Sequence, residues 1–450
     1  MSKKSFIFTF SIFVFVFINS TGPYFNISGN LRARFALTKS IVDDQVIDIT
    51  KHKNYIGYDQ ATVKDKVYCT HNPGFSVLMA LPYLLITKPI SLISNSPVTK
   101  ENFIKEAWLT KTLTMAILVS LSLLPFFLIL RSYFGNSSFF APLYLFTPTL
   151  LFPYLTSPFA DLASALLQFP LIYLIFEKKS ELKNKHYYLI FFIIFILSLV
   201  KPTNSILAIS FLVYVILNKN LIAAKIIVFS LVTFAIAQSF YNYSFDGNPF
   251  TFIVQYFNPM GQIQSPVYDP FSEVMQIFNL KKIFYLFFDP YDGLITYNCI
   301  LLLVLYKLKT MNTKQLCALV SPVLLLIFFF FFRNWNLGAD FGWRNGLPLI
   351  PLLLYIVITK WDNNIYVFKF FRIFGFIITF IYSIPFLYSV VINYKAIDSH
   401  QILSFYFIEM AKAPQSILSN TNFEFHGFIL ILLSFLFIFY SYKRFHSDEV

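Results

Sequence analysis

Side chains that could do chemistry gather in a few polar segments of an otherwise apolar chain. The first of these segments holds Arg34, Asp43, Asp44, Asp59 and His71. A carboxylate within reach of a hydroxyl group can accept its proton, while guanidinium and imidazole groups can bind an anion. Each acid can equally be a solvated loop charge or a turn residue, because Asp, Asn, Gly and Pro are the residues that turns require.

Three other charged residues differ from these loop charges in their position. Asp161, Lys201 and Arg344 stand where apolar stretches of the chain begin or end. Placing a charge at the centre of a bilayer costs about 2.5 to 3.5 kcal/mol, so charges close to hydrocarbon are usually paired or functional. We therefore expect each of the three to have a partner or a role.

The composition indicates a membrane protein. Of the 450 residues, 57% are hydrophobic and 13% are charged, whereas about a quarter of the residues of a soluble chain are charged. The net charge of +13 is dispersed between apolar stretches, which argues against a nucleic-acid partner. Because about 20 residues of helix cross the hydrocarbon, about twelve spans fit the chain. The predicted spans are 6–18, 108–130, 138–155, 161–176, 187–200, 203–218, 222–241, 294–307, 315–332, 345–359, 373–393 and 426–442.

The stretch 75–93 decides the topology. It is apolar enough to cross a membrane, but it contains Pro82, Lys88 and Pro89. If it lies flat on the membrane surface, seventeen basic residues fall on the cytoplasmic side and the short outward loops hold only three. This asymmetry is what the positive-inside rule predicts, and a crossing at 75–93 would reverse it. We therefore predict that 75–93 does not cross and that both termini are cytoplasmic.

These patterns predict an all-α, multi-pass protein of the plasma (inner) membrane, with 1–450 forming one transmembrane domain. Three longer outer segments are expected at 20–107, 242–293 and 394–424. A long loop without secondary structure is uncommon in a compact domain. We therefore expect short helices on the membrane surface within the first outer segment.

Several sequence motifs then follow one another in order. NLRARFALTKSIVDDQVIDI (30–49) leads to YDQATVKDKVYCTHNPGFSVLMALPYLL (58–85), and later come FDGNPF (245–250), DPYDGLITYN (289–298) and FGWRNGLPLIPLL (341–353). Together they resemble the bacterial membrane glycosyltransferases of the GT-C superfamily. In that family an arginine-bearing helix leads to a D-K-x-P-G-x-S-x-L-x-x-L-P motif, and G-N-P, G-L and Y-G-x-R-x-x-x-P-x-x-P elements follow.

The resemblance implies a function and a first set of site residues. A sugar would pass from a polyprenyl-phosphate carrier to a lipid or glycan acceptor at the outer face of the membrane. Asp43 or Asp44 would be the base that deprotonates the acceptor. Arg34 and Arg344 would bind the lipid phosphate, since a guanidinium can bind phosphate through two hydrogen bonds, and Lys201 could assist.

Two departures from the family pattern leave alternatives open. Family members commonly carry the catalytic Asp directly after the first span, whereas residues 24–30 contain no acid. Thr70 and His71 also replace an acid and a base of the family motif. Asp59 could therefore be the acid instead, His71 could keep a cationic role, or the chain could be a noncatalytic subunit.

A transporter or lipid flippase is the main alternative to an enzyme. Such proteins place ionisable residues and broken helices near the membrane midplane, often in repeated halves. The charges of this chain lie mainly at helix ends and in loops, and no repeat is evident. Carboxylates of the outer loops could hold a divalent cation, although no spacing demands one.

Overall fold

A computed structural model describes most of the first outer segment and a large part of the helical bundle. The described residues are 10, 13, 14, 29–57, 59–94, 97, 99–135, 145, 146, 149, 151, 160–178, 182–250, 287, 294–306, 308–331, 344–361, 366–371, 373 and 374. The predicted spans 6–18, 138–155, 373–393 and 426–442 lie largely or wholly outside this part. So do most of 251–293 and all of 394–424.

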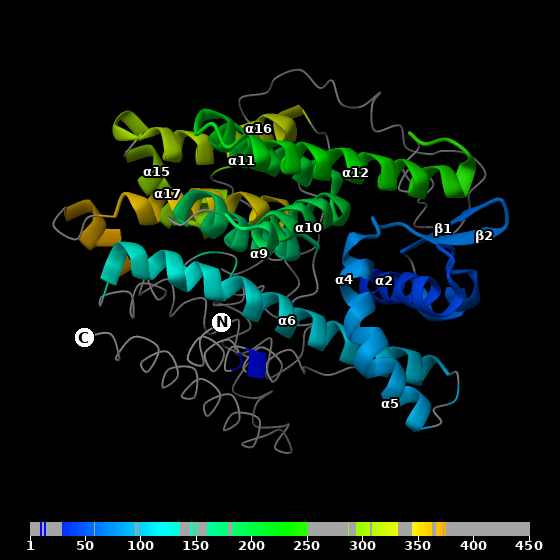
Figure 1. Ribbon diagram of the computed structural model, residues 1–450. Helices are drawn as coiled ribbons and strands as arrows, with labels where there is room; N and C mark the ends of the chain where they lie inside the picture. Colours follow the sequence, from blue (N-terminus) through cyan, green and yellow to red (C-terminus); the bar gives the residue numbers. More distant parts are fainter. Residues whose placement is uncertain are drawn as a thin grey trace, which may run out of the picture.

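The described part is almost entirely helical, as predicted (Figure 1). The first outer segment contains α2 (Gly29–Lys39), η2 (Ser40–Asp44), η3 (Thr50–His52), α3 (Lys53–Ile56), β1 (Gln60–Val63), β2 (Lys66–Cys69), α4 (Gly74–Pro82), η4 (Tyr83–Thr87) and α5 (Lys88–Ile93). The bundle contains α6 (Lys100–Phe134), α9 (Ala160–Ile172), η6 (Tyr173–Glu177), α10 (Asn184–Val200), η7 (Pro202–Ile206), α11 (Leu207–Leu217), α12 (Leu221–Asp246), α14 (Leu294–Tyr297), η9 (Cys299–Leu301), α15 (Leu302–Tyr306), η10 (Leu308–Thr310), α16 (Thr313–Phe331), η11 (Arg344–Leu349) and α17 (Ile350–Thr359).

Several helices of the described part suit a membrane by length and apolar composition. Four are long enough to cross: Gly74–Ile93, Lys100–Phe134, Ala160–Glu177 and Leu221–Asp246. Four shorter apolar helices accompany them: Asn184–Val200, Pro202–Leu217, Thr313–Phe329 and Gly346–Thr359. The chain is thus a polytopic membrane protein. Apart from Gly74–Ile93, which was predicted to lie on the membrane surface, these helices coincide with predicted spans.

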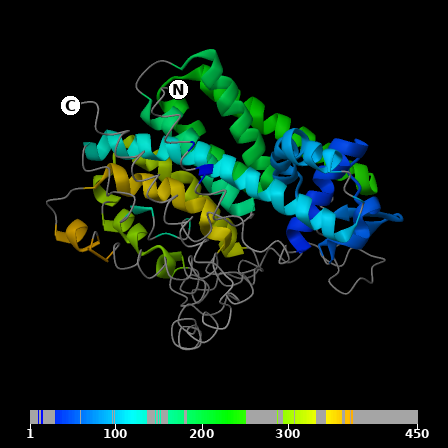
Figure 2. The ribbon, with the colours of Figure 1, turned by 90° about the horizontal axis from the view of Figure 1, so that it is seen from below.

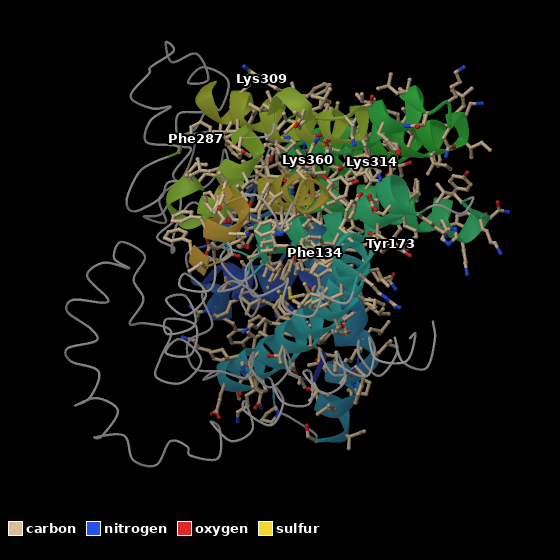
Figure 3. The ribbon with its side chains drawn as sticks, turned by 90° about the vertical axis from the view of Figure 1, so that its left-hand side faces the viewer. Phe134, Tyr173, Phe287, Lys309, Lys314 and Lys360 are labelled. Carbon is tan, nitrogen blue, oxygen red and sulfur yellow. The ribbon has the colours of Figure 1, made fainter. Side chains whose placement is uncertain are left out.

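One end of the bundle is held together around Glu177, and we call it the inner end after the predicted topology. The Glu177 carboxylate accepts hydrogen bonds from the hydroxyls of Tyr133 (2.9 Å) and Tyr355 (2.6 Å) and from Lys314 Nζ (2.6 Å). Seen from this end, Lys309, Lys314 and Lys360 lie among the helix ends, with Phe134 and Tyr173 beside them (Figure 3). The ends of α6, η6 and α17 therefore meet the start of α16 here, as the alternating topology predicts.

The first outer segment lies at the opposite end, which we call the outer end (Figures 1 and 2). Tyr241 near the end of α12 donates a hydrogen bond to the carbonyl of His71 (3.4 Å), and Lys64 Nζ donates to the carbonyl of Asp246 (3.1 Å). The last turn of α10 packs against Gly74. The first loop therefore sits on the outer ends of α10 and α12.

Both ends of the stretch 74–93 stay at this outer end. Gly74 contacts the end of α10, while Ser91 Oγ donates a hydrogen bond to Glu106 (2.5 Å) in the second turn of α6. At 1.5 Å per residue, Glu106 is roughly 40 Å from Phe134 at the inner end of α6. Figure 1 shows α4 and α5 running steeply across the bundle helices. By length and composition the stretch is also a candidate span, so its placement flat on the membrane surface remains a prediction.

Within the first outer segment, the expected short helices are present, but a β-hairpin accompanies them. Strands β1 and β2 pair antiparallel, with Gln60 opposite Cys69 and Val63 opposite Lys66. Their tight turn holds Lys64 and Asp65 at positive φ values of 48° and 64°. This hairpin was not predicted, and it brings the polar residues on either side of it together.

Candidate functional site

Arg34, Asp43, Asp59, His71 and Lys201 fall into three polar groups at the outer end, whereas Asp44 and Arg344 belong to none of them. The arginine cluster is Arg34, Asp59 and His71. The second group is the ion pair of Asp161 in α9 and Lys201 in the turn after α10. The lysine pocket contains Asp43 and is lined by Lys39, Asp43, His52, Tyr55, Tyr83, Lys88, Ser91, Leu92, Pro97, Thr99, Asn102, Phe103 and Glu106.

Helix α2 supplies Arg34 to the arginine cluster. The side chain is only 5% exposed, and its Nε donates a hydrogen bond to Asn30 Oδ1 (2.7 Å), one helical turn earlier. The guanidinium carbon lies 5.6 Å from the ring centroid of Phe75. The Arg34 carbonyl also accepts a hydrogen bond from Ser76 Oγ (2.9 Å), which ties α2 to α4. Arg34 is therefore held firmly from both helices.

The β-hairpin brings Asp59 and His71 to the same place, because Asp59 precedes β1 and His71 follows β2. His71 Nε2 lies 3.5 Å from Asp59 Oδ1, and the two side chains are 23% and 27% exposed respectively. Burial alone would raise the pKa of Asp59, but the hydrogen bond and charge of His71, with Arg34 and Arg32 nearby, lower it below its usual value. Asp59 is thus an ionised carboxylate beside cationic groups at neutral pH.

A close backbone contact joins this cluster to the turn after α10. A β-carbon at Gly74 would lie 2.2 Å from the backbone nitrogen of Val200. No side chain fits in this space, since real Cβ contacts under 3.0 Å essentially do not occur. Lys201 follows Val200 directly, so the motif that starts at His71 is placed next to the turn that carries Lys201.

Lys201 itself is paired, as its position in the sequence predicts. Its Nζ donates to Asp161 Oδ1 (2.7 Å), and the Asp161 side chain is 8% exposed. Asn204 Nδ2, in the same turn, donates to Ser164 Oγ (2.6 Å) one helical turn after Asp161. The α10–η7 turn is therefore fastened to the outer end of α9, next to the arginine cluster.

The two acids predicted as the base lie away from the arginine cluster. Asp43 lines the lysine pocket and accepts hydrogen bonds from Tyr83 Oη (2.6 Å) and Lys88 Nζ (2.7 Å). Burial raises the pKa of Asp43, but these hydrogen bonds and the charges of Lys88 and Lys39 outweigh it, so the net pKa is lowered. Asp44 pairs with Lys51 Nζ (2.7 Å), whose side chain is 68% exposed.

Arg344 lies on a different element from these three groups. Its backbone opens η11, and this short helix packs on α9, where Gln168 Nε2 donates to the carbonyl of Pro348 (2.8 Å). The Arg344 side chain lies outside the described residues. Among the His, Cys, Asp and Glu residues that the structure describes, no group of three or more could hold a metal ion. The divalent cation thus remains a prediction.

Of the charged residues that line the lysine pocket, only Asp43 was a predicted site residue. Lys39 Nζ donates to Glu106 Oε2 (2.6 Å) across the pocket, and Tyr83 bonds Asp43. These residues come from α2, η2, η4 and α6, and no local sequence pattern links the four elements. Lys88 counted in the sequence against a crossing at 75–93. A lysine within an apolar stretch was also the one local signal for a polar pocket.

Comparison with known proteins adds little to this geometry. Protein-family models give no match, and curated proteins give none either. Among solved structures, the chain is similar to ArnT from Cupriavidus metallidurans bound to undecaprenyl phosphate, with a TM-score of 0.48 and 11% sequence identity over 97% of this chain and 76% of that chain. At this level of similarity, the chemistry has to be inferred from the residues of the chain itself.

Proposed function

We propose that this protein is a membrane glycosyltransferase that takes a sugar from a polyprenyl-phosphate carrier at the outer face of the membrane and transfers it to a lipid or glycan acceptor. The observation that carries the proposal is the arginine cluster. An ionised carboxylate, Asp59, lies 3.5 Å from His71 and close to Arg34, at the outer end of an apolar helical bundle. Acid and cations are both needed for such a transfer.

The reaction assigns a task to each group. Asp59 accepts the proton of the acceptor hydroxyl while the hydroxyl oxygen of the acceptor attacks the anomeric carbon of the sugar. The bond from that carbon to the carrier phosphate oxygen breaks, and the phosphate leaves with the bonding electron pair. Positive charge near the leaving phosphate lowers the barrier. Arg34 supplies it from its buried position near Asp59, while His71, Lys201 and Arg344 are the groups proposed to reach the phosphate.

The surroundings of the cluster suit a carrier with a long hydrocarbon chain. Helix α4 begins three residues after His71, and the outward face of the 74–93 stretch is apolar and exposed. Leu81 is 60% exposed, Leu85 63% and Ile93 83%. Exposed leucines and isoleucines on one helix face are typical of contact with lipid. A polyprenyl chain along this face would leave its phosphate near the outer end of the bundle.

Asp59 is proposed as the base in preference to Asp43 or Asp44. It shares its cluster with Arg34 and His71, whereas Asp43 pairs with Tyr83 and Lys88 and Asp44 with Lys51. The three side chains are similarly exposed, at 27%, 23% and 28%, so the preference rests on the neighbouring Arg34 and His71. A base must reach the substrate hydroxyl directly. Asp43 and Asp44 remain the alternative bases, on the strength of the family resemblance alone.

The assay that tests the proposal follows release of undecaprenyl phosphate from a panel of undecaprenyl-phosphate-linked hexoses and pentoses. Purified protein is supplied with lipid and glycan acceptors extracted from envelopes, and products are identified by mass spectrometry. Wild type should form a glycosidic product. Asp59→Asn should lower the rate about 10² to 10⁴-fold, the usual contribution of a general base, and the Asp43→Asn/Asp44→Asn double variant should lower it far less. A larger loss of activity in the double variant than in Asp59→Asn would identify Asp43 or Asp44 as the base.

A transporter or flippase predicts a different result in the same preparation. In sealed vesicles, such a protein would move the lipid-linked sugar between leaflets without releasing carrier phosphate. Buried ion pairs of the described part lie near one end of the bundle or the other, as with Asp161 and Lys201 outside and Glu177 and Lys314 inside. Translocation without a glycosidic product would reject the transferase and leave transport.

A further inference from the structure

The lysine pocket is a separate cavity on the far face of α2 from the arginine cluster. Its volume is 440 Å³, which is within the range of pockets that bind small molecules. Four charged side chains line it as two ion pairs. Lys39 Nζ lies 2.6 Å from Glu106, and Lys88 Nζ lies 2.7 Å from Asp43. All four side chains keep some exposure, between 14% and 33%, so a ligand can reach them.

The charges of the pocket cancel, and this limits the kind of ligand that fits. An anion that contacts Lys39 or Lys88 has to compete with a carboxylate, and a cation has to compete with a lysine. A zwitterion can take one partner from each pair, because its phosphate replaces a carboxylate and its ammonium replaces a lysine. No buried charge is then left without a partner, which is the costly outcome.

Neutral groups of the pocket favour an ammonium over a bulky polar head. Tyr55, Tyr83 and Phe103 line the cavity, and Lys39 Nζ already lies 5.3 Å from the Tyr83 ring centroid. Aromatic faces attract cations at such distances. Asn102 adds an amide whose second N–H can donate to a phosphate, the first being donated to the Pro97 carbonyl (2.9 Å).

The pocket opens beside the apolar face of the 74–93 stretch. Leu92 lines the pocket and is 66% exposed, and its neighbour Ile93 is 83% exposed. Leu81, Leu85, Lys88 and Leu92 follow one another at spacings of four, three and four residues, which places them on one side of the helical stretch. A headgroup in the pocket would therefore have its acyl chains continue along leucines that already face outward.

We infer that the lysine pocket binds a phospholipid with a zwitterionic phosphoethanolamine headgroup, taken from the outer leaflet. The phosphate contacts Lys39 and Lys88, the primary ammonium donates to Asp43 and Glu106, and the acyl chains lie against Leu85 and Leu92. Phosphocholine fits less well, because its quaternary nitrogen has no N–H to donate to the two carboxylates. This inference does not depend on the proposed glycosyl transfer.

Native mass spectrometry of the full-length protein in detergent tests the inference. The protein is titrated with dioleoyl phosphatidylethanolamine, phosphatidylcholine or phosphatidylglycerol of the same chain length. Phosphatidylethanolamine should bind about tenfold more tightly than either of the other lipids, which corresponds to about 1.4 kcal/mol. Equal binding of the three lipids, or a preference for phosphatidylglycerol, would overturn the inference.

Variants locate the binding and control for general effects of charge. Lys39→Met with Glu106→Gln removes one pair without changing net charge and should abolish the tenfold preference. The matched control is Lys105→Met with Glu101→Gln, a surface pair on the same helix at 2.7 Å, and it should keep the preference. Loss of preference in both, or in neither, contradicts the assignment.

Folding and lipid source are controlled separately. If the Lys39/Glu106 variant does not fold, Asp43→Asn with Lys88→Met removes the other pair and carries the same expectation. Glycerophosphoethanolamine has the headgroup without acyl chains, and it should compete at least tenfold more weakly than the phospholipid. Competition as strong as that of the intact lipid would show that the ligand is a free headgroup and not a membrane lipid.

Discussion

Gly74 packs against the backbone of Val200 so closely that a β-carbon at Gly74 would lie 2.2 Å from the Val200 nitrogen. This contact sets α4 directly on the last turn of α10. It therefore determines how near the first loop, with His71, comes to the turn that carries Lys201. The close packing therefore explains why the Asn72-Pro73-Gly74 motif ends in glycine, independently of the activity of the protein.

Replacing Gly74 tests this contact. Gly74→Ala should destabilise the protein by about 1 to 3 kcal/mol or more, because overpacking against backbone forces α4 away from α10. The measurement is thermal unfolding in detergent. Gly247→Asn is a suitable control, since Gly247 has open space around it and a φ of +86°, which asparagine tolerates. An unchanged melting temperature for Gly74→Ala would contradict the close packing.

The ion pair of Asp161 and Lys201 gives a second prediction. Lys201→Met should cost up to about 3 to 5 kcal/mol, since it removes the cation from an aspartate that is 8% exposed, and Asp161→Leu should cost less, since Lys201 is 25% exposed. The double variant Asp161→Leu/Lys201→Met should be far less destabilised, because it leaves no unpaired charge. Unfolding of all three variants gives the coupling free energy. Additive effects would mean that the 2.7 Å pair contributes nothing.

The inner junction around Glu177 gives a third prediction. Tyr133→Phe and Tyr355→Phe each remove one hydrogen bond to a carboxylate that is 8% exposed. Hydrogen bonds to charged groups contribute about 1.5 to 3 kcal/mol. The loss at Tyr355 should be the larger, because that bond is 2.6 Å long against 2.9 Å for Tyr133. If both variants have the same free energy of unfolding as wild type, the two tyrosine hydrogen bonds to Glu177 do not stabilise the protein.

Stability should also depend on pH through His52. Burial, followed by the charge of Lys39, lowers the pKa of this imidazole below 6.5. Above pH 6.5 the ring is neutral in both folded and unfolded chains, so it adds no pH dependence there. As the pH falls below 6.5, the unfolded chain takes up the proton first, so the folded state loses stability until the lower pKa is passed.

His52→Gln should remove this part of the acid destabilisation. The melting temperature of wild type should fall between about pH 6.5 and 5 by more than that of His52→Gln. Asp43 and Asp59 contribute nothing over this interval, because their pKa values are lowered from 3.8 and both stay ionised. Parallel pH curves for variant and wild type would exclude His52 as the source.

The sequence was enough to predict the all-helical, polytopic character of the described part, while the full number of spans and their orientation stay predictions. Apolar stretches of about twenty residues and the uneven distribution of lysine and arginine predict the spans and their alternation, because hydrocarbon thickness and membrane orientation act on the chain locally. Charges at the edges of hydrocarbon predict a partner for Lys201, and the structure confirms it with Asp161. Gly74 contacts the end of α10 and Ser91 contacts α6, but the placement of the stretch 75–93 on the membrane surface stays a prediction.

The composition of the site was harder to predict, because it depends on pairings distant in sequence. Asp59 meets His71 only through the hairpin, whose turn uses Lys64 and Asp65 at positive φ. Asn-Gly and Asp-Gly are the usual signals for such a turn, so the hairpin escaped prediction. Lys39 and Glu106 are 67 residues apart, and only the packing of α2 on α6 brings them together.

The proposed transferase and the lipid pocket both require that the first loop lies outside and the Glu177 junction inside. A membrane-impermeant maleimide on spheroplasts measures this directly, with Asn54→Cys in α3 and Lys185→Cys at the start of α10, after the three native cysteines are replaced by alanine. Asn54→Cys should react in intact spheroplasts, and Lys185→Cys only after permeabilisation. Labelling of Lys185→Cys in intact spheroplasts, with Asn54→Cys protected, would contradict the account.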